Sequence, residues 1–300
     1  MRAAAFAEPG DPDVLRIHEL PDPQAGPGEV RVRVRTAGVQ PFDAALRRGW
    51  VPPYATVQLP QPPGNEFAGV VDQGTDAVPA GTEVLGFSVF GSYAQYVVVP
   101  ADQVTPKPAG VPWEVAGGFT AGWQTARLAL SALGVGPGDT LLVNAAAGST
   151  GTAGVQLARL LGATVIGTAS GQNQDYVRSI GAIPVVYGEG LLDRVRSLAP
   201  QGVTAAIDGA GGDALEVSLA LVADRKRIIT LVAHDRIEKL GLASIQGRRS
   251  AEALAELIAL YAAGTTQWHV RRTYPLEEAA AAHREIETGH GRGKIVLTVD

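Results

Sequence analysis

The stretch Thr140-Leu-Leu-Val-Asn-Ala-Ala-Ala-Gly-Ser-Thr-Gly-Thr-Ala-Gly-Val-Gln-Leu-Ala-Arg-Leu-Leu-Gly162 changes its periodicity part-way along. Residues 141–143 form a short apolar run that is typical of a buried strand. Small residues follow, including Gly148 and Gly151, and apolar residues then recur at helical spacing. A strand, a small-residue turn and a helix make the unit that holds the pyrophosphate of a dinucleotide, because the free N–H groups and the dipole at the helix start attract phosphate.

This turn reads Ala145-x-x-Gly148-x-x-Gly151 in place of the usual G-x-G-x-x-G. The strand before it and the helix after it favour a dinucleotide site, since that context is what the motif requires. The alternative is a tight strand-to-helix turn in an unrelated α/β protein. For a dinucleotide site, we expect the turn to contact the cofactor through Ala147, Gly148, Ser149, Thr150 and Gly151.

The composition excludes several classes of protein. A chain of 300 residues is long enough for two domains, and a net charge of -5 provides no basic face for nucleic acid. No apolar run is long enough to span a membrane. Without cysteine there can be no disulfide, thiolate nucleophile or cysteine-ligated zinc, and the five histidines lack metal-binding spacing. We therefore expect a cytoplasmic protein without a metal.

The first third of the chain has the pattern of a small closed or partly closed barrel. Residues 29–35 alternate valine with arginine, which indicates a strand with one buried and one solvated face. Further short strands are expected at 67–71, 82–87 and 92–99.

From Pro112 onward, short apolar strands alternate with alanine-rich helices. This βαβα order predicts a doubly wound parallel sheet. The expected strands are 140–144, 164–168, 184–187, 204–207 and 227–232, and the expected helices are 152–161, 174–180, 191–198 and 213–221. The chain then continues with a helix, a strand, a helix and a strand at 251–263, 270–274, 276–288 and 294–299.

Five separated segments, in order along the chain, resemble motifs of the medium-chain dehydrogenase/reductase superfamily. They are Thr36-Ala-Gly-Val-Gln-Pro-Phe-Asp43, Pro63-Gly-Asn-Glu-Phe-Ala-Gly-Val-Val71, Gly91-Ser-Tyr-Ala-Gln-Tyr96, residues 143–156 and Gly291-Arg-Gly-Lys-Ile-Val-Leu297. Within the superfamily, the chain is most similar to the zinc-free, zeta-crystallin-like quinone oxidoreductases. The resemblance implies a GroES-like β-barrel domain at 1–112 and 264–300, and a Rossmann NADP-binding domain at 113–263. It also implies an active cleft between the domains and a homodimer.

The second expected strand of the Rossmann domain ends without an acidic residue. An acid at that place binds the ribose hydroxyl of NAD, so its absence favours NADP. Thr168, Ser170 and Asn173 could instead bind a 2′-phosphate, although they could also belong to an ordinary polar loop. By resemblance, further cofactor contacts are Gln124, Thr125, Tyr187, Gly209, Val232, Ala233 and Lys294. Lys294 could equally be a solvated charge at the end of a strand.

The resemblance implies transfer of a hydride from NADPH to a quinone or an α,β-unsaturated carbonyl compound. Without zinc, hydrogen bonds must polarise the carbonyl group and a proton must follow. The catalytic candidates are Tyr54, Gln40 and Asp43, with Asn65 as a further candidate. Asp43 could instead fix the backbone, and Tyr54 could simply pack in a loop. Trp50 and Phe90 could form flat walls for a planar substrate, or could belong to the core.

Three hypotheses for the function follow. The first is a zinc-independent NADPH oxidoreductase acting on a quinone or enone. The second is an enoyl-thioester reductase of the polyketide or fatty-acid type, for which Arg47 and Arg48 are the nearest candidates to bind a substrate phosphate. The third is an NADP-binding protein without redox turnover, acting as a sensor, a scaffold or a non-redox enzyme.

Overall fold

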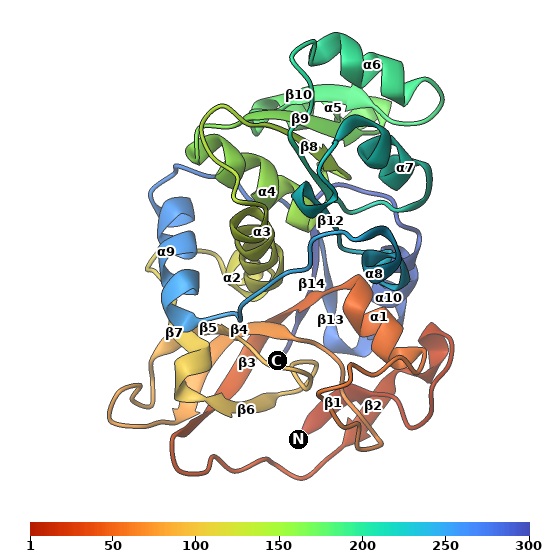
Figure 1. The fold of residues 1–300 in the computed structure, drawn as a ribbon. Coiled ribbons are helices and arrows are strands. Elements are labelled where there is room, and N and C mark those ends of the chain that lie inside the picture. Colours follow the sequence, from red (N-terminus) through yellow and green to blue (C-terminus); the bar gives the residue numbers. More distant parts are fainter. The chain divides into compact units, whose positions relative to one another are not determined.

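The computed structural model describes residues 1–300, which divide into two compact units. Unit 1 combines Met1–Ala121 with Arg249–Asp300, and unit 2 is Gly122–Arg248. Both ends of the chain thus contribute to unit 1, where the last strand, β14 (Lys294–Thr298), pairs with β3 (Glu29–Val39) (Figure 1).

Unit 1 is built around a seven-stranded sheet in the order β13-β14-β3-β4-β5-β7, with β6 also paired to β3. Its other strands are β13 (Val270–Pro275), β4 (Glu66–Gln73), β5 (Glu83–Phe87), β6 (Tyr96–Pro100) and β7 (Val104–Pro106), and β1 (Arg2–Ala5) pairs with β2 (Arg16–Glu19) in a separate hairpin. The valine–arginine alternation of β3 has the predicted effect, since Val30, Val32 and Val34 are buried in the core. The helices are α1 (Pro41–Arg47), α2 (Trp113–Gly117), α9 (Ala251–Ala262) and α10 (Ala279–Glu287).

Helices α2 and α9 belong to unit 1, while their residues lie within the range 113–263 expected for the Rossmann domain. Helix α2 packs on β3, β4 and β14, and α9 packs on β7. The approach of α2 is close: the Thr36 hydroxyl donates to the Trp113 carbonyl at 2.7 Å. A Cβ on Gly117 would lie 2.2 Å from the Thr36 Oγ1 atom, so glycine is needed there.

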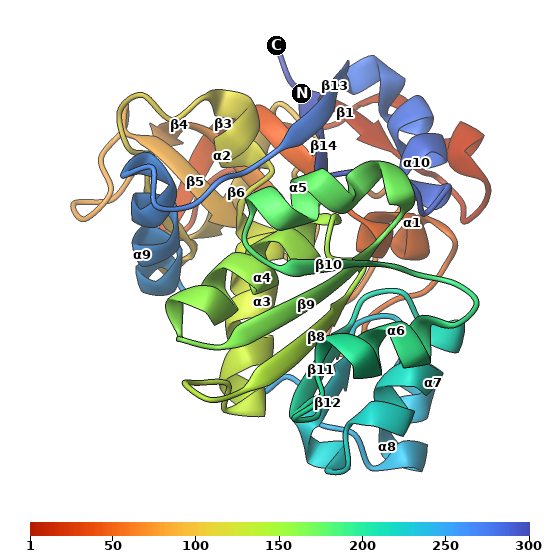
Figure 2. The same ribbon diagram turned by 90° about the horizontal axis from the view of Figure 1, so that it is seen from above.

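Unit 2 contains a five-stranded parallel sheet in the order β10-β9-β8-β11-β12. The strands are β8 (Thr140–Asn144), β9 (Thr164–Ala169), β10 (Ile183–Val186), β11 (Ala205–Asp208) and β12 (Ile228–Thr230). Helices α4 (Ser149–Leu160) and α5 (Gln174–Ser179) cover one face, and α6 (Leu191–Leu198) and α7 (Gly212–Leu221) cover the other (Figure 2). The predicted doubly wound sheet is confirmed. Its strand order reverses between β8 and β11, which is where such folds bind ligands.

Two further helices complete the fold. The longer, α3 (Thr120–Leu133), begins at the end of unit 1 and runs into unit 2, and the short α8 (Ile237–Leu240) follows β12. No helix combines the length and the apolar character needed to cross a membrane.

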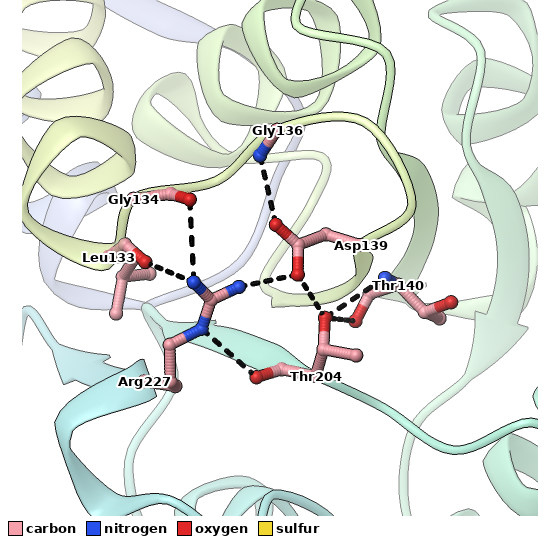
Figure 3. Close-up of polar contacts among 7 residues, drawn as sticks. All are labelled: Leu133, Gly134, Gly136, Asp139, Thr140, Thr204 and Arg227. Atoms are coloured by element: carbon pink, nitrogen blue, oxygen red, sulfur yellow. Dashed lines mark hydrogen bonds and ion pairs between the residues drawn. The ribbon is translucent and has the colours of Figure 1, made fainter.

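A polar cluster around Arg227 joins the segments that lead into strands β8, β11 and β12 (Figure 3). The guanidinium donates to the carbonyls of Leu133 at 2.7 Å and Thr204 at 3.3 Å, and pairs with Asp139. The Asp139 carboxylate also accepts from the Thr204 hydroxyl at 2.7 Å. One side chain therefore links the end of α3 to the starts of β8, β11 and β12.

Candidate functional site

The turn between β8 and α4 leaves a helix start ready to receive an anion. The N–H of Gly148 donates to the Ala145 carbonyl at 3.0 Å, and no side chain caps α4. The first N–H that finds a helical acceptor is that of Thr152, which bonds the Gly148 carbonyl at 2.8 Å. The three preceding amides, from Ser149 to Gly151, have no partner in the helix. Together with the helix dipole, they fit a pyrophosphate group.

Two features hold this turn in shape. Ala145 has a φ of 59°, which is unusual for a residue other than glycine. Its N–H is held by the Thr168 hydroxyl at 3.2 Å, which in turn donates to the Asn144 Oδ1 atom at 3.2 Å. A Cβ on Gly151 would lie 2.3 Å from the Ala145 carbonyl oxygen, so the helix can approach the turn only with glycine there.

Asn144 is an important residue that the sequence analysis did not single out. Its Nδ2 donates to the Ala214 carbonyl at 3.0 Å and to the Ser218 hydroxyl at 2.9 Å, so it joins the turn to α7. Thr168, expected to contact a 2′-phosphate, is buried and uses its hydroxyl within this network. The hydroxyl accepts from the N–H of Ala145 and donates to Asn144, and its contact with a 2′-phosphate stays a prediction.

Ser170, Asn173 and Tyr187 follow the carboxyl ends of the neighbouring strands β9 and β10. The Asn173 amide donates to the Ser170 hydroxyl at 3.0 Å, and the N–H of Tyr187 donates to the Ala169 carbonyl at 3.3 Å. The Tyr187 ring is about half exposed, at 48%. Beside it, the Arg194 guanidinium donates to the carbonyls of Val186 and Glu189, at 2.9 and 2.7 Å. Arg194 therefore brings a positive charge next to Tyr187.

The loops after β11 and β12 carry the other expected cofactor contacts, Gly209, Val232 and Ala233. Asp208 accepts from the N–H of Ala210 at 3.0 Å and from the Thr230 hydroxyl at 2.8 Å. Thr230 accepts in turn from the N–H of Ala233 at 3.1 Å. These bonds fix both loops at the same edge of the sheet as the α4 turn. The two expected contacts on α3 differ in burial, since Gln124 is buried and Thr125 is half-buried, and Ala147 is buried in the turn.

In unit 1, the buried carboxylate of Glu66 connects three other segments. Its Oε1 accepts from the Gln40 amide at 2.7 Å and pairs with the Lys294 ammonium at 2.6 Å, and its Oε2 accepts from the N–H of Ala121 at 2.6 Å. A Cβ on Gly38 would lie 2.0 Å from this carboxylate, so glycine makes room for it. Lys294 is 1% exposed, so the alternative of a solvated charge is wrong.

Asp43 fixes the start of α1, as one of its two interpretations predicted. Its carboxylate accepts from the N–H of Gln40 at 2.9 Å, the N–H of Gly64 at 3.2 Å and the Tyr93 hydroxyl at 3.1 Å. Burial raises the pKa of Asp43 to about 7, against the lowering effects of the Lys294 charge and these hydrogen bonds. The Tyr93 hydroxyl also lies 3.3 Å from the buried His283 ring, whose pKa burial lowers to about 3.

The segment around Tyr54 presents aromatic surface to solvent. Tyr54 is 77% exposed, and Trp50 is 47% exposed. The Phe42 ring contacts Trp50 edge-on at 5.6 Å and stacks on Phe90 at 6.3 Å between centroids. Trp50 and Phe90 thus belong to an aromatic cluster with Phe42, in which Trp50 is exposed and Phe90 also packs against the core of unit 1. A planar conjugated molecule could pack against such a surface.

The two arginines considered as phosphate ligands have another partner. Arg47 is buried and pairs with Glu287 of α10 at 2.6 Å, and Arg48 pairs with the same carboxylate. They therefore join α1 to α10 and do not form a free basic surface.

Comparisons with known proteins give matches to both units of the chain. Residues 26–109 match the family model of the alcohol dehydrogenase GroES-like domain, and 180–297 match that of zinc-binding dehydrogenases. A quinone oxidoreductase from Coxiella burnetii has a TM-score of 0.87 at 28% identity, covering 100% of this chain and 99% of that one. A mycobacterial structure complexed with NADPH has a TM-score of 0.86 at 30% identity, covering 99% and 100%.

The chain belongs to the medium-chain dehydrogenase/reductase superfamily. Within it, the chain is a member of the zeta-crystallin-like quinone oxidoreductase family, as its motifs predicted. A curated relative, the pikromycin polyketide synthase component PikAII of Streptomyces venezuelae, is 33% identical over 318 residues. That match covers 98% of this chain but only 8% of the synthase, so the chain corresponds to a small part of that protein.

The name of one matching model raises the question of zinc. The chain has no cysteine, and no group of three or more His, Cys, Asp or Glu side chains is arranged to hold a metal ion. The donor set therefore does not fit the zinc site that the name of the family model implies.

Proposed function

We propose that this member of the quinone oxidoreductase family is a zinc-independent, NADPH-dependent oxidoreductase that reduces a quinone or an α,β-unsaturated carbonyl compound. When bound, the cofactor would supply a hydride to the acceptor. The observation that carries the proposal is the start of α4, where three backbone amides without helical partners follow a turn that only glycine permits at position 151. These residues would hold the pyrophosphate.

The choice of NADPH over NADH is supported by the loops after β9 and β10. Ser170 and Asn173 offer a hydroxyl and an amide, and the Arg194 guanidinium adds positive charge next to Tyr187. No carboxylate stands at the end of β9 to repel a 2′-phosphate. The substrate class is supported by the aromatic cluster of Phe42, Trp50 and Phe90, which suits a planar conjugated acceptor.

The test is NADPH oxidation with 1,4-naphthoquinone and with cyclohexenone, alongside calorimetric titration of NADPH and NADH. We expect turnover with at least one acceptor and tighter binding of NADPH than of NADH.

Ser170→Asp places a negative charge in the proposed phosphate loop and should lower the preference for NADPH about 10-fold or more. Ser197→Asp, on the exposed surface of α6, is the matched control and should leave the preference unchanged. Tight NADPH binding without oxidation by either acceptor contradicts the proposal and favours a non-redox role.

A second candidate is reduction of an enoyl thioester, which the match to a polyketide synthase component favours. The pairing of Arg47 and Arg48 with Glu287 removes the basic surface expected to bind a substrate phosphate. Crotonyl-coenzyme A and a crotonyl thioester without phosphate, used as acceptors, separate the two candidates. Faster NADPH oxidation with these thioesters than with quinones would favour the second.

A further inference from the structure

Arg249 lies where the chain returns to unit 1, next to the start of α9. It is the first residue of the C-terminal part of that unit and directly precedes Ser250, the N-cap of α9. The Ser250 side chain accepts from the N–H of Ala253 at 3.1 Å, which anchors the backbone next to Arg249. The position of the arginine is therefore set by a helix cap rather than by a loose loop.

The guanidinium of Arg249 has almost no partner within the protein. It is half-buried, and its one hydrogen bond is a long contact of 3.5 Å from Nη1 to the Asn65 carbonyl oxygen. No carboxylate lies within ion-pair distance, unlike at Arg47, Arg227 and Arg271, which each pair with an acid. Most of its N–H groups therefore have no acceptor within the protein. These donors remain available to a ligand.

Three other polar side chains expected to bind cofactor or substrate are already occupied. The Gln40 amide and the Lys294 ammonium are both bonded to Glu66, and the Asp43 carboxylate holds two backbone amides. Tyr54 is exposed and its hydroxyl makes no hydrogen bond in the protein. Arg249 and Tyr54 are therefore two donors of this region that could still bind a ligand.

The groups around Arg249 are consistent with binding of a ligand by its guanidinium. Burial lowers the pKa of the guanidinium from its ordinary value, while the nearby Glu66, Tyr54 and Asp43 oppose that shift. The charge of Glu66 is already balanced by Lys294, so Glu66 does not also balance the charge of the Arg249 guanidinium. The Asn65 Oδ1 atom is also buried without a hydrogen-bond partner. The available guanidinium of Arg249 and an unpartnered amide oxygen thus belong to residues that meet at the start of β4.

We propose that Arg249, with Tyr54 beside it, binds the carbonyl oxygen of the acceptor and stabilises the negative charge that forms there during reduction. This proposal rests on the proposed function and assigns the residue that replaces zinc in polarising the carbonyl. A hydride from the nicotinamide adds to the β-carbon of an enone or to a quinone, and its electron pair ends on the carbonyl oxygen. The cofactor is oxidised, the acceptor becomes an enolate or hydroquinone anion, and a proton from water completes the product. A fixed guanidinium near that oxygen favours the charged state.

The first experiment compares Arg249→Gln and Arg249→Lys with the wild type. We expect Arg249→Gln to lower kcat with naphthoquinone about 100-fold while leaving the Kd of NADPH, which binds to unit 2, unchanged. Arg249→Lys should retain part of the rate, because it keeps the charge but not the planar fork. Arg248→Gln is the matched control, since the neighbouring arginine is exposed, and it should retain the wild-type rate. Addition of guanidinium ion should restore part of the activity of Arg249→Ala, which a merely structural role would not allow.

A second measurement does not depend on turnover. 4-Nitrophenol resembles a phenolic product and changes colour on ionisation, so its absorbance with enzyme and NADP⁺ reports how strongly the site favours an oxyanion. We expect the wild type and Arg248→Gln to lower the pKa of the bound phenol, and Arg249→Gln not to do so. If the wild type fails to oxidise NADPH but shows this shift, the proposed function is wrong and the oxyanion site stands. If the wild type turns over and Arg249→Gln matches it in both rate and phenol ionisation, the inference about Arg249 is overturned.

Discussion

Asp43 in unit 1 and Asp139 in unit 2 lie in surroundings that shift their pKa values in opposite directions. Burial raises the pKa of Asp43 to about 7 and outweighs its hydrogen bonds and the Lys294 charge. Burial also acts to raise the pKa of Asp139, but donors from Thr204, Gly136 and Arg227 outweigh it and the pKa is lowered (Figure 3). The two carboxyl groups differ in burial and in charge: Asp43 is fully buried, whereas Asp139 is partly exposed and has a guanidinium in contact.

These opposite shifts predict opposite pH dependences of stability. Folded Asp43 keeps a proton that the unfolded chain has lost, so its favourable contribution is lost as the pH rises from about 4 to about 7. Folded Asp139 binds its proton more weakly than the unfolded chain, so its contribution is present above about pH 4 and is lost below that. Urea unfolding of the wild type, Asp43→Asn and Asp139→Asn across this range measures both effects. A stability difference between the wild type and Asp43→Asn that does not change between these pH values would contradict the first.

At this scale, the sequence predicted residues better than it predicted their partners. Gln40 and Asp43 were found because they stand in a motif close to the start of a helix. That the Gln40 amide is held by Glu66, and Glu66 by Lys294, depends on β3, β4 and β14 meeting in one unit. Such pairings join residues far apart in the chain, so the local periodicity of the sequence cannot predict them. The same holds for Arg249, whose neighbour Asn65 lies in the motif before β4.

Helix α4 shows how one substitution can have opposite effects within a single element. A Cβ on Gly151 would lie 2.3 Å from the Ala145 carbonyl oxygen, whereas a Cβ on Gly154 would meet only Ile207 and Ala126, at 3.9 and 4.0 Å. We expect Gly151→Ala to destabilise unit 2 by about 1–3 kcal/mol and to weaken NADPH binding, because the turn must move. Gly154→Ala should stabilise it by about 0.4–1 kcal/mol without changing binding, since alanine restricts the unfolded chain and fits the helix. Thermal unfolding and NADPH titration of both variants provide the test. If both substitutions change the stability in the same direction, the close contact at Gly151 does not determine the stability of this helix.

The elements of unit 2 could be predicted closely because apolar runs and glycines mark their ends. Strand β8 has the bounds expected from its apolar run. Helix α4 begins at Ser149, three residues before the expected start, because its first turn consists of small and polar residues that carry no helical periodicity. In unit 1, α10 begins at Ala279 rather than at 276, since a short 3₁₀ turn at Leu276–Glu278 follows Pro275. Both differences fall at helix starts, where capping rather than burial decides the conformation.

The molecule as a whole consists of one continuous and one discontinuous unit, and this predicts how its parts fold when separated. Unit 2 is a single stretch whose five parallel strands pair with one another. Unit 1 needs its C-terminal part, because β14 lies between β13 and β3 and buries Ile295 and Leu297 in the core. Residues 1–121 alone would leave the β14-facing edge of β3 unpaired and the apolar core of unit 1 uncovered.

We therefore expect residues 122–248, produced alone, to unfold cooperatively in urea and residues 1–121 to lack a cooperative transition. The physical reason is that a domain needs a closed core, which only the first fragment retains. A chain in which a flexible Gly-Ser linker replaces residues 122–248 is the control: it restores β13, β14 and α10 and should recover the cooperative transition of unit 1. Amide hydrogen exchange would then show protection in β3 of the linked chain and none in β3 of residues 1–121. Cooperative unfolding of residues 1–121 would mean that β14 is an addition to unit 1 rather than a requirement for its fold, and loss of cooperativity in residues 122–248 would mean that unit 2 depends on unit 1.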